Sequence, residues 1–302
     1  MSLFNKLVIY GLPITPKPIV GYFSKPYIAG PELVDAVNVV KELNSEGIMA
    51  TIDVLGEEIN KIEQSNEDAG LYMQVLDAIK EHNLDSNISL KPTHMGLKLD
   101  PQQAYRNIDM IIAKAKEMDN FVRIDMEDHT VTTETIEMYH KFHEKYGENV
   151  GTVIQAYMRR TIDDVKALGK VKANIRLCKG IYIEPRRISY RDYWTVNKNF
   201  TWAMEVLLKA GSYVGIATHD ERLVWEALKL IDELNLKKED FEFQMLLGVD
   251  PLLRKIILDH GYRLRVYVPF GQDWYPYSVR RLKENPNIAK NALQALFRND
   301  QE

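Results

Sequence analysis

Short apolar runs alternate with stretches of helical periodicity along almost the whole chain, and this alternation limits the fold more than any other feature. Most of the runs are apolar throughout, and most are followed by a segment whose apolar residues recur at helical spacing. Strands of this kind are typical of parallel sheets that are covered on both faces. The expected strands are eight in number and lie within residues 48–56, 87–97, 121–128, 150–158, 173–182, 212–220, 241–249 and 262–271.

Eight strand–helix units favour a closed (β/α)8 barrel of the TIM type over an open, doubly wound sheet. The chain has 302 residues, 45% of them apolar, which suffices for one large domain. We expect a single barrel domain at residues 31–302, after an irregular N-terminal arm at residues 1–30. The arm contains Pro13, Pro16, Pro18 and Pro26, too many prolines for one regular element.

The helices between the strands are expected where apolar residues recur every three or four positions. Thr161 is expected to cap the short helix that follows the fourth strand. A long polar loop is expected at residues 184–198, before the helix that follows the fifth strand. The predicted helices begin with Pro31 and lie near residues 71–84, 101–118, 132–146, 161–169, 199–210, 221–234, 251–260 and from 277 onward.

Composition narrows the function classes. The formal charge of −4 argues against a broad nucleic-acid surface. The single cysteine, Cys178, cannot form an internal disulfide and fits a reducing compartment. No window approaches about 20 apolar residues, the length of a membrane-spanning helix. We therefore expect an enzyme or binding protein that is either free in the cytoplasm or bound peripherally to the inner face of the cell membrane.

The stretch at residues 267–284, YVPFGQDWYPYSVRRLKE, joins the last strand to a helix. Helical spacing places Tyr277, Arg280, Arg281 and Glu284 on one side of that helix. Two adjacent guanidinium groups at such a junction suit a small carboxylate that is bound bidentately. Taken alone, the same pair also fits a solvated surface at the start of a helix.

Polar residues follow or end most of the predicted strands, where the active sites of such barrels lie. Each one alone could belong to a buried ion pair or point outward to the helices, but the whole set favours a ligand site. Cations outnumber carboxylates in it, which indicates an anionic ligand such as a pyrophosphate or a carboxylate. The set comprises Lys91, Asp125, Glu127, Gln155, Arg176, Lys179, Tyr182, Thr218, His219, Gln244 and Tyr267.

Two common cofactor signatures do not stand out. No G-x-G-x-x-G opens a helix after a strand, which argues against a Rossmann dinucleotide site. His140 and His143 are three residues apart on a helix, but no third ligand is evident, so we expect no metal site.

Seven motifs in the chain, in the same order, resemble those of the proline dehydrogenase family, including the dehydrogenase barrel of the bifunctional proline utilization A enzymes. The resemblance extends from residue 27 to residue 286 and is closest to the monofunctional bacterial type. It rests most on the Tyr-x-x-Arg-Arg-x-x-Glu helix. The motifs are SLKPTHMGL, RIDMED, QAYMRRT, RLCKGIY, IATHD, FQMLLG, and RVYVPFG followed by YSVRRLKEN.

The resemblance implies a role for each matching residue. Arg280 and Arg281 correspond to the pair that binds the proline carboxylate, and Arg176 to the arginine beside the flavin N5. Asp125 and Arg176 are the expected catalytic residues. The expected substrate pocket comprises Lys91, Asp125, Tyr182, Leu246, Tyr267 and Tyr277. The expected FAD contacts are Met126, Gln155, Arg176, Lys179, Gly180, Ile181, Thr218, His219 and Glu284.

The chain departs from the family pattern in places. Ile181 stands where the family usually has alanine, and Leu247 stands where histidine is common. The turn after the last strand is about two residues shorter than in the bifunctional enzymes, as judged from the motif spacing. The turn borders the expected substrate pocket, so its behaviour as a lid is left open.

The sequence thus predicts an FAD-dependent oxidation of L-proline to Δ1-pyrroline-5-carboxylate, the first step of proline catabolism. The resemblance also implies a membrane quinone as electron acceptor and, with it, peripheral membrane contact. Two alternatives stay open: a cofactor-free lyase or aldolase that uses Lys91 or Lys179 as a Schiff-base nucleophile, and a non-catalytic barrel that binds a small acid.

Overall fold

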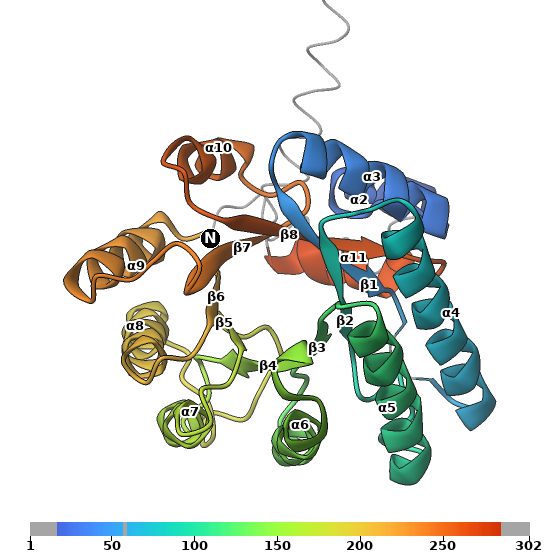
Figure 1. The fold of residues 1–302 in the computed structure, drawn as a ribbon, viewed down its shortest axis with the longest axis horizontal. Coiled ribbons are helices and arrows are strands. Elements are labelled where there is room, and N and C mark those ends of the chain that lie inside the picture. Colours follow the sequence, from blue (N-terminus) through green and yellow to red (C-terminus); the bar gives the residue numbers. More distant parts are fainter. Residues whose placement is uncertain (1–16, 57–58, 285–302) are drawn as a thin grey trace, which may run out of the picture.

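A closed ring of eight parallel strands, in the order β1 to β8, forms the centre of the computed structural model, which describes residues 17–56 and 59–284. The ring closes where β8 pairs with β1 and aligns Arg265 with Met49 and Phe270 with Val54. The predicted (β/α)8 barrel is therefore confirmed (Figure 1). The strands are β1 (Met49–Val54), β2 (Ser86–Leu90), β3 (Val122–Ile124), β4 (Val150–Gln155), β5 (Ile175–Cys178), β6 (Val214–Ala217), β7 (Phe241–Leu246) and β8 (Leu264–Phe270).

Helices surround the strands and connect them in chain order (Figure 1). Short 3-10 helices, η2 (Lys25–Tyr27) and η3 (Gly147–Asn149), complete the connections. The α-helices are α2 (Lys17–Ser24), α3 (Leu33–Ser45), α4 (Ile62–Glu81), α5 (Pro101–Glu117), α6 (Thr132–Tyr146), α7 (Thr161–Gly169), α8 (Tyr193–Lys209), α9 (Glu221–Glu233), α10 (Pro251–Asp259) and α11 (Trp274–Glu284).

Apolar stripes bury these helices against the strands. In α9, the residues Leu223, Ala227, Leu230 and Ile231 lie at i, i+4, i+7 and i+8, and all four are buried. The strands are buried on both faces, as in β1, where all six residues are buried. One of them, Asp53, is a fully buried carboxylate.

Side-chain caps set where several helices begin. The Asp192 carboxylate accepts a 2.8 Å hydrogen bond from the Thr195 amide, so α8 begins at Tyr193, inside the expected polar loop. The expected Thr161 cap is wrong. Thr161 is the first residue of α7, and its hydroxyl donates instead to the Gln155 carbonyl, 2.7 Å away.

The described part of the N-terminal arm is helical rather than irregular. Pro18 lies in the first turn of α2, where its missing N–H breaks no helical hydrogen bond, so proline does not prevent a helix there. This helix packs against α11, and a Cβ atom on Gly21 would lie 3.1 Å from the Trp274 ring. Tyr277 of α11 is buried with Ile28 in a small apolar cluster at the same place. The arm therefore supports the helix that carries Tyr277.

Among the described helices, none combines the length and the apolar character needed to cross a membrane.

Candidate active site

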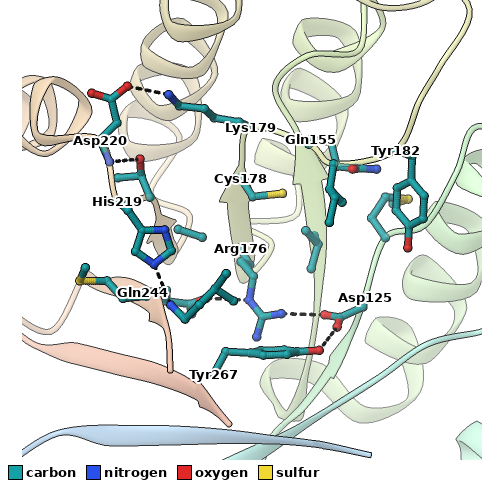
Figure 2. Close-up of a pocket in the computed structure, with 18 of the residues that line it drawn as sticks. Asp125, Gln155, Arg176, Cys178, Lys179, Tyr182, His219, Asp220, Gln244 and Tyr267 are labelled. Carbon is teal, nitrogen blue, oxygen red and sulfur yellow. Dashed lines mark hydrogen bonds and ion pairs between the residues drawn. The ribbon is translucent and has the colours of Figure 1, made fainter. Parts of the chain in front are cut away.

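A cavity of about 770 Å³ opens at the carboxyl ends of the strands (Figure 2). Its volume falls within the usual range for a small-molecule or cofactor site. The structure brings together every residue that the family resemblance assigns to the site and whose side chain it describes. These are Lys91, Asp125, Met126, Gln155, Arg176, Lys179, Gly180, Ile181, Tyr182, Thr218, His219, Leu246, Tyr267 and Tyr277. Glu127, which the sequence also placed among the polar residues of the site, does not line the cavity, and its carboxylate accepts from the Thr93 amide at 2.9 Å.

Three expected residues are not tested in this way. Arg280, Arg281 and Glu284 belong to α11, but their side chains lie outside the described residues. Tyr277, one turn earlier on the same helix, does line the cavity. The carboxylate-binding pair therefore stays a prediction.

Seven further residues line the cavity, and the sequence predicts no individual role for them. Signals for some of them were present in the sequence. Asp220 ends the IATHD motif, and Gln244 is one of the polar residues of the seventh strand. Asp53 lies below the lining, as the one carboxylate of an apolar strand. The additional lining residues are Val153, Cys178, Ala217, Asp220, Glu221, Gln244 and Met245.

Asp125 organises the floor of the cavity. Its Oδ1 accepts from Arg176 Nη1 at 2.7 Å and from the Ser89 hydroxyl at 2.5 Å. Its Oδ2 accepts from the Tyr267 hydroxyl at 3.2 Å, and the Arg176 guanidinium lies 5.2 Å from the centre of the Tyr267 ring (Figure 2). Both carboxylate oxygens are thus hydrogen-bonded, and one charged group orients the arginine and the phenol together.

Lys91 forms an ion pair with Asp53, whose Oδ2 lies 2.8 Å from the ammonium nitrogen. Burial raises the pKa of Asp53; the Lys91 charge opposes this shift, and the nearby Asp125 adds to it. Burial followed by the same two carboxylates raises the pKa of Tyr267 well above its usual value. Tyr267 therefore stays protonated near neutral pH and acts as a hydrogen-bond donor. The ion pair stabilises the ammonium form of Lys91, whereas a Schiff-base nucleophile needs the neutral amine.

Lys179 lies at the opposite side of the cavity, 2.6 Å from the Asp220 carboxylate (Figure 2). Burial tends to raise the pKa of Asp220, but hydrogen bonds from Lys179, Tyr193 and Asn197 outweigh it and lower the pKa. The ammonium group also lies 4.6 Å from the centre of the Tyr193 ring. Asp220 and Tyr193 together hold a cation at the rim, where it can meet an anionic ligand.

The backbone after β5 is close to the next loop. Gly180 has a φ of +106°, and a Cβ atom there would lie 2.2 Å from the Tyr157 ring. The Tyr157 amide also donates to the Lys179 carbonyl at 2.8 Å. Only glycine fits this position, so the chain at Gly180 packs directly against Tyr157 where it lines the cavity.

Gln155 offers a buried acceptor at the cavity wall. Its Nε2 donates to the Glu127 carbonyl at 2.8 Å, while its Oε1 has no hydrogen-bond partner within the described part of the chain. A buried acceptor of this kind is expected to meet a donor from a ligand or water. Across the cavity, His219 Nε2 accepts from the Leu246 amide at 2.9 Å, which fixes the neutral tautomer of this ring as protonated at Nδ1.

In the parts of the chain that the structure describes, no group of three or more His, Cys, Asp or Glu residues could hold a metal ion. His143, for example, contacts the Gly147 carbonyl through Nδ1 at 3.0 Å and stacks on Tyr139.

Comparison with known proteins shows the family to which the chain is similar. The sequence model of the family described as proline dehydrogenase matches residues 36–294. Proline dehydrogenase 1 of Bacillus subtilis strain 168 is 37% identical over 272 residues, which cover 90% of each chain. The proline dehydrogenase of Deinococcus radiodurans is 36% identical over 276 residues, covering 90% of this chain and 89% of the relative.

Solved structures show the same fold. Proline utilization A (PutA) from Bdellovibrio bacteriovorus, inactivated by N-propargylglycine, superimposes with a TM-score of 0.81 at 25% identity and covers 93% of this chain. A variant of Bradyrhizobium japonicum PutA superimposes with a TM-score of 0.72 over 87% of this chain. The chain spans only about a third of these two PutA chains, 34% and 31%.

The barrel superimposes on the PutA structures, and full-length relatives match at more than a third of positions. The family model covers nearly the whole barrel. The chain therefore belongs to the proline dehydrogenase family, the oxidoreductases that oxidise proline in proline catabolism.

Proposed function

We propose that this barrel binds FAD non-covalently in the cavity, oxidises L-proline to Δ1-pyrroline-5-carboxylate, and passes the electrons to a membrane quinone. The observation that carries the proposal is the convergence of the expected flavin and proline residues on one cavity of about 770 Å³. The bound flavin would supply the acceptor for the hydride that leaves the proline ring carbon next to nitrogen. The residues of the chain would bind the flavin and proline and orient them toward each other.

We propose that the flavin occupies the part of the cavity that lies between the side chains of Gln155 and Lys179. The buried Oε1 of Gln155 can accept from an N–H at the edge of the flavin ring. The Lys179 ammonium group, held at the rim by Asp220, can contact the pyrophosphate. Gly180 and Ile181 line the same wall of the cavity, where their backbone can contact the cofactor. Met126, Thr218, His219 and Glu284 complete the proposed cofactor contacts.

The substrate half of the site is proposed to lie between β8 and α11. Arg280 and Arg281 would bind the proline carboxylate, and Lys91, Tyr182, Leu246, Tyr267 and Tyr277 would surround the ring. Arg176 would place its positive charge beside the flavin, where negative charge develops as hydride arrives. Asp125 would act by fixing Arg176 and Tyr267, its two hydrogen-bonded neighbours.

The geometry favours this proposal over its alternatives. The Lys91–Asp53 ion pair disfavours the neutral amine that a lyase would need at Lys91, and Lys179 is paired in the same way with Asp220. Borohydride reduction in the presence of a small keto acid such as pyruvate should therefore trap no adduct on either lysine. A trapped adduct would favour the lyase.

Two measurements test the cofactor and the substrate separately. Acid or heat should release all the yellow chromophore from the purified protein, and the released compound should match FAD by chromatography. The FAD-loaded protein should then reduce an artificial dye only when L-proline is added. Colour left in the protein pellet would contradict non-covalent binding, and dye reduction independent of proline would contradict the substrate.

The acceptor and the location need their own tests. The FAD-loaded protein should reduce a soluble ubiquinone or menaquinone analogue with proline as donor. In fractionated cells, it should be found partly with membranes and be released by high salt, as expected for peripheral contact. A relative, Bdellovibrio PutA, is inactivated by N-propargylglycine. We expect the same compound to abolish proline oxidation here, with protection by L-proline.

A further inference from the structure

A series of buried hydrogen bonds connects Arg176, at the cavity floor, with Glu242 on β7. Arg176 Nε donates to Gln244 Oε1 at 2.6 Å, and Gln244 Nε2 donates to Glu242 Oε1 at 2.6 Å. The exposed fractions of the three residues are 9%, 6% and 2%. Figure 2 shows the first of these contacts, between the arginine of β5 and the glutamine of β7. Glu242 itself is not part of the cavity lining.

The chemistry at both ends fixes the orientation of the amide between them. A guanidinium N–H can only donate, so it requires the Gln244 oxygen to face Arg176. An ionised carboxylate can only accept, so it requires the Gln244 NH₂ to face Glu242. The turned amide would place two donors against each other at the arginine. Arg176 and Glu242 therefore select the same orientation of the Gln244 amide, and Glu242 reinforces the contact with Arg176.

The Glu242 carboxylate also accepts hydrogen bonds from two residues other than Gln244. Its Oε1 also accepts from Arg265 Nε at 2.8 Å, and its Oε2 accepts from the Tyr213 hydroxyl at 2.8 Å. Arg265 in turn donates to the Ala50 carbonyl of β1 at 2.7 Å. The carboxylate is thus held by Tyr213, the residue before β6, and by Arg265 of β8, which also contacts β1.

The neighbouring strand leaves space for this arrangement. Gly215 of β6 lies opposite Glu242 in the strand register. A Cβ atom on Gly215 would lie 2.4 Å from Gln244 Nε2. The amide therefore occupies the space that a side chain would otherwise fill, which is an independent sign that its position is built into the fold.

We infer that Glu242 is a positioning residue of the reaction, which acts through Gln244 to hold the Arg176 guanidinium in place at the cavity floor. Asp125 holds the same guanidinium at Nη1, so Arg176 is fixed from two sides. The inference rests on the proposed function, because it assumes that Arg176 faces a bound flavin.

The direct test is the Glu242→Gln variant, loaded with FAD. A glutamine at this position can donate as well as accept, so only Arg176 still selects the orientation of the Gln244 amide, and the amide is held less firmly. We expect the bound FAD to lose about tenfold in its preference for the reduced form, a fall of about 30 mV in midpoint potential for a two-electron couple. We also expect kcat to fall about tenfold and KM for proline to stay within about threefold, since the proposed carboxylate pair is on α11.

Tyr213→Phe is the matched control. It removes the hydrogen bond to Oε2 of Glu242 but leaves the contact between Oε1 and Gln244 unchanged. This variant should lose thermal stability, as Glu242→Gln does, but should keep the midpoint potential of the unmutated enzyme. A shift as large in Tyr213→Phe as in Glu242→Gln would mean that the potential follows general loosening of the barrel, and would overturn the inference.

A second variant keeps the test decisive if Glu242→Gln does not fold. Gln244→Met leaves the Glu242–Arg265 pair in place and should lower the potential by itself. If both variants fold, their combination should shift the potential no further than the larger single shift, because both act through one hydrogen bond on Arg176. Additive shifts, or single variants with the potential of the unmutated enzyme, would overturn the inference.

The outcome for the unmutated protein separates this inference from the proposed function. If the unmutated protein binds FAD and oxidises proline, unchanged variants overturn the role of Glu242 alone. If it binds no FAD, the proposed function is wrong and the inference is wrong with it.

Discussion

The hydroxyl of Tyr267 lies between Lys91 Nζ, 3.4 Å away, and Asp125 Oδ2, to which it donates a hydrogen bond of 3.2 Å. Tyr267 belongs to β8 and Asp125 follows β3, so this contact links strands that are not neighbours in the ring. Because Tyr267 stays protonated near neutral pH, the contact persists through the range in which the enzyme works. The Tyr267 hydroxyl thus connects the Lys91–Asp53 ion pair with the Arg176–Asp125 ion pair.

Tyr267→Phe should reduce activity without removing the cofactor. The variant leaves one lone-pair site of a buried carboxylate unsatisfied, which costs about 1–3 kcal/mol. If this cost falls on the transition state, kcat/KM for proline drops about 5- to 150-fold. Steady-state kinetics and the FAD content of the purified variant measure the two effects.

The control is Tyr139→Phe, which changes a fully buried tyrosine that does not line the cavity. Its kcat/KM should equal that of the unmutated enzyme. A Tyr267→Phe variant with full activity would show that the Tyr267–Asp125 contact plays no part in the reaction.

Arg281→Met should raise KM for proline strongly and leave flavin content near normal. Removing one charged partner of a buried carboxylate costs about 2–5 kcal/mol, and this arginine is proposed to bind substrate and not cofactor. Lys283→Met, on the same helix but at an unspecified position of the Tyr-x-x-Arg-Arg-x-x-Glu pattern, is the control. An unchanged KM in Arg281→Met would remove the proposed carboxylate pair from the account.

Gly180→Ala should destabilise the protein and lower its FAD content. The added Cβ meets the Tyr157 ring at 2.2 Å, and the residue must also keep a φ of +106°. Gly211→Ala is a matched control, because the φ of Gly211 is +77° but an added Cβ would meet only the flexible Lys172 side chain, at 3.8 Å.

We expect Gly211→Ala to cost about 1 kcal/mol from backbone strain alone, and Gly180→Ala to cost more. Thermal unfolding of both apoproteins, together with FAD titration, checks this order. Equal stability losses and equal FAD affinities would contradict the close contact at Gly180.

Glu242 should make the protein sensitive to acid. Burial tends to raise the pKa of Glu242, but Arg265, Tyr213 and Gln244 together lower it from 4.5 to about 2. A carboxyl group with a lowered folded-state pKa stabilises the fold fully above its unfolded pKa. That contribution is lost as the pH falls from 4.5 towards 2.

Urea unfolding from pH 7 to pH 3 tests this sign. The difference in unfolding free energy between the unmutated protein and Glu242→Gln should be constant above about pH 5 and shrink below it. A difference that grows as the pH falls would show that the pKa of Glu242 is raised in the folded protein.

The barrel could be predicted from sequence because its signals are local. A strand buried on both faces is a short apolar run, and a helix that covers it repeats every three or four residues. The start of α8 at Tyr193 was missed because Tyr193 and Trp194 begin a helix within a charged stretch, and only the Asp192 cap reveals where. The number of prolines in the arm does not exclude a helix there, because a proline in the first turn of a helix, such as Pro18 in α2, breaks no helical hydrogen bond.

The site could be predicted in part because its residues stand at strand ends, a position that the alternation itself reveals. Partners could not be predicted in the same way. That Asp53 pairs with Lys91, or that Glu242 meets Gln244, depends on which side chains point into the barrel and how neighbouring strands align. Asp53 and Lys91 belong to different parts of the chain, and no local pattern encodes their pairing. Glu242 and Gln244 share one face of β7 as i and i+2, but the residues that they meet on other strands, Arg176 and Arg265, are not encoded locally.

The visible spectrum of the purified protein, recorded without oxygen before and after adding L-proline, tests the central claim most directly. The account predicts a flavin spectrum before addition and bleaching of the flavin band after it. D-proline, which presents the ring carbon differently to the flavin face, should bleach it far more slowly. A protein that takes up no FAD, or whose flavin band is unchanged by L-proline, would contradict the account.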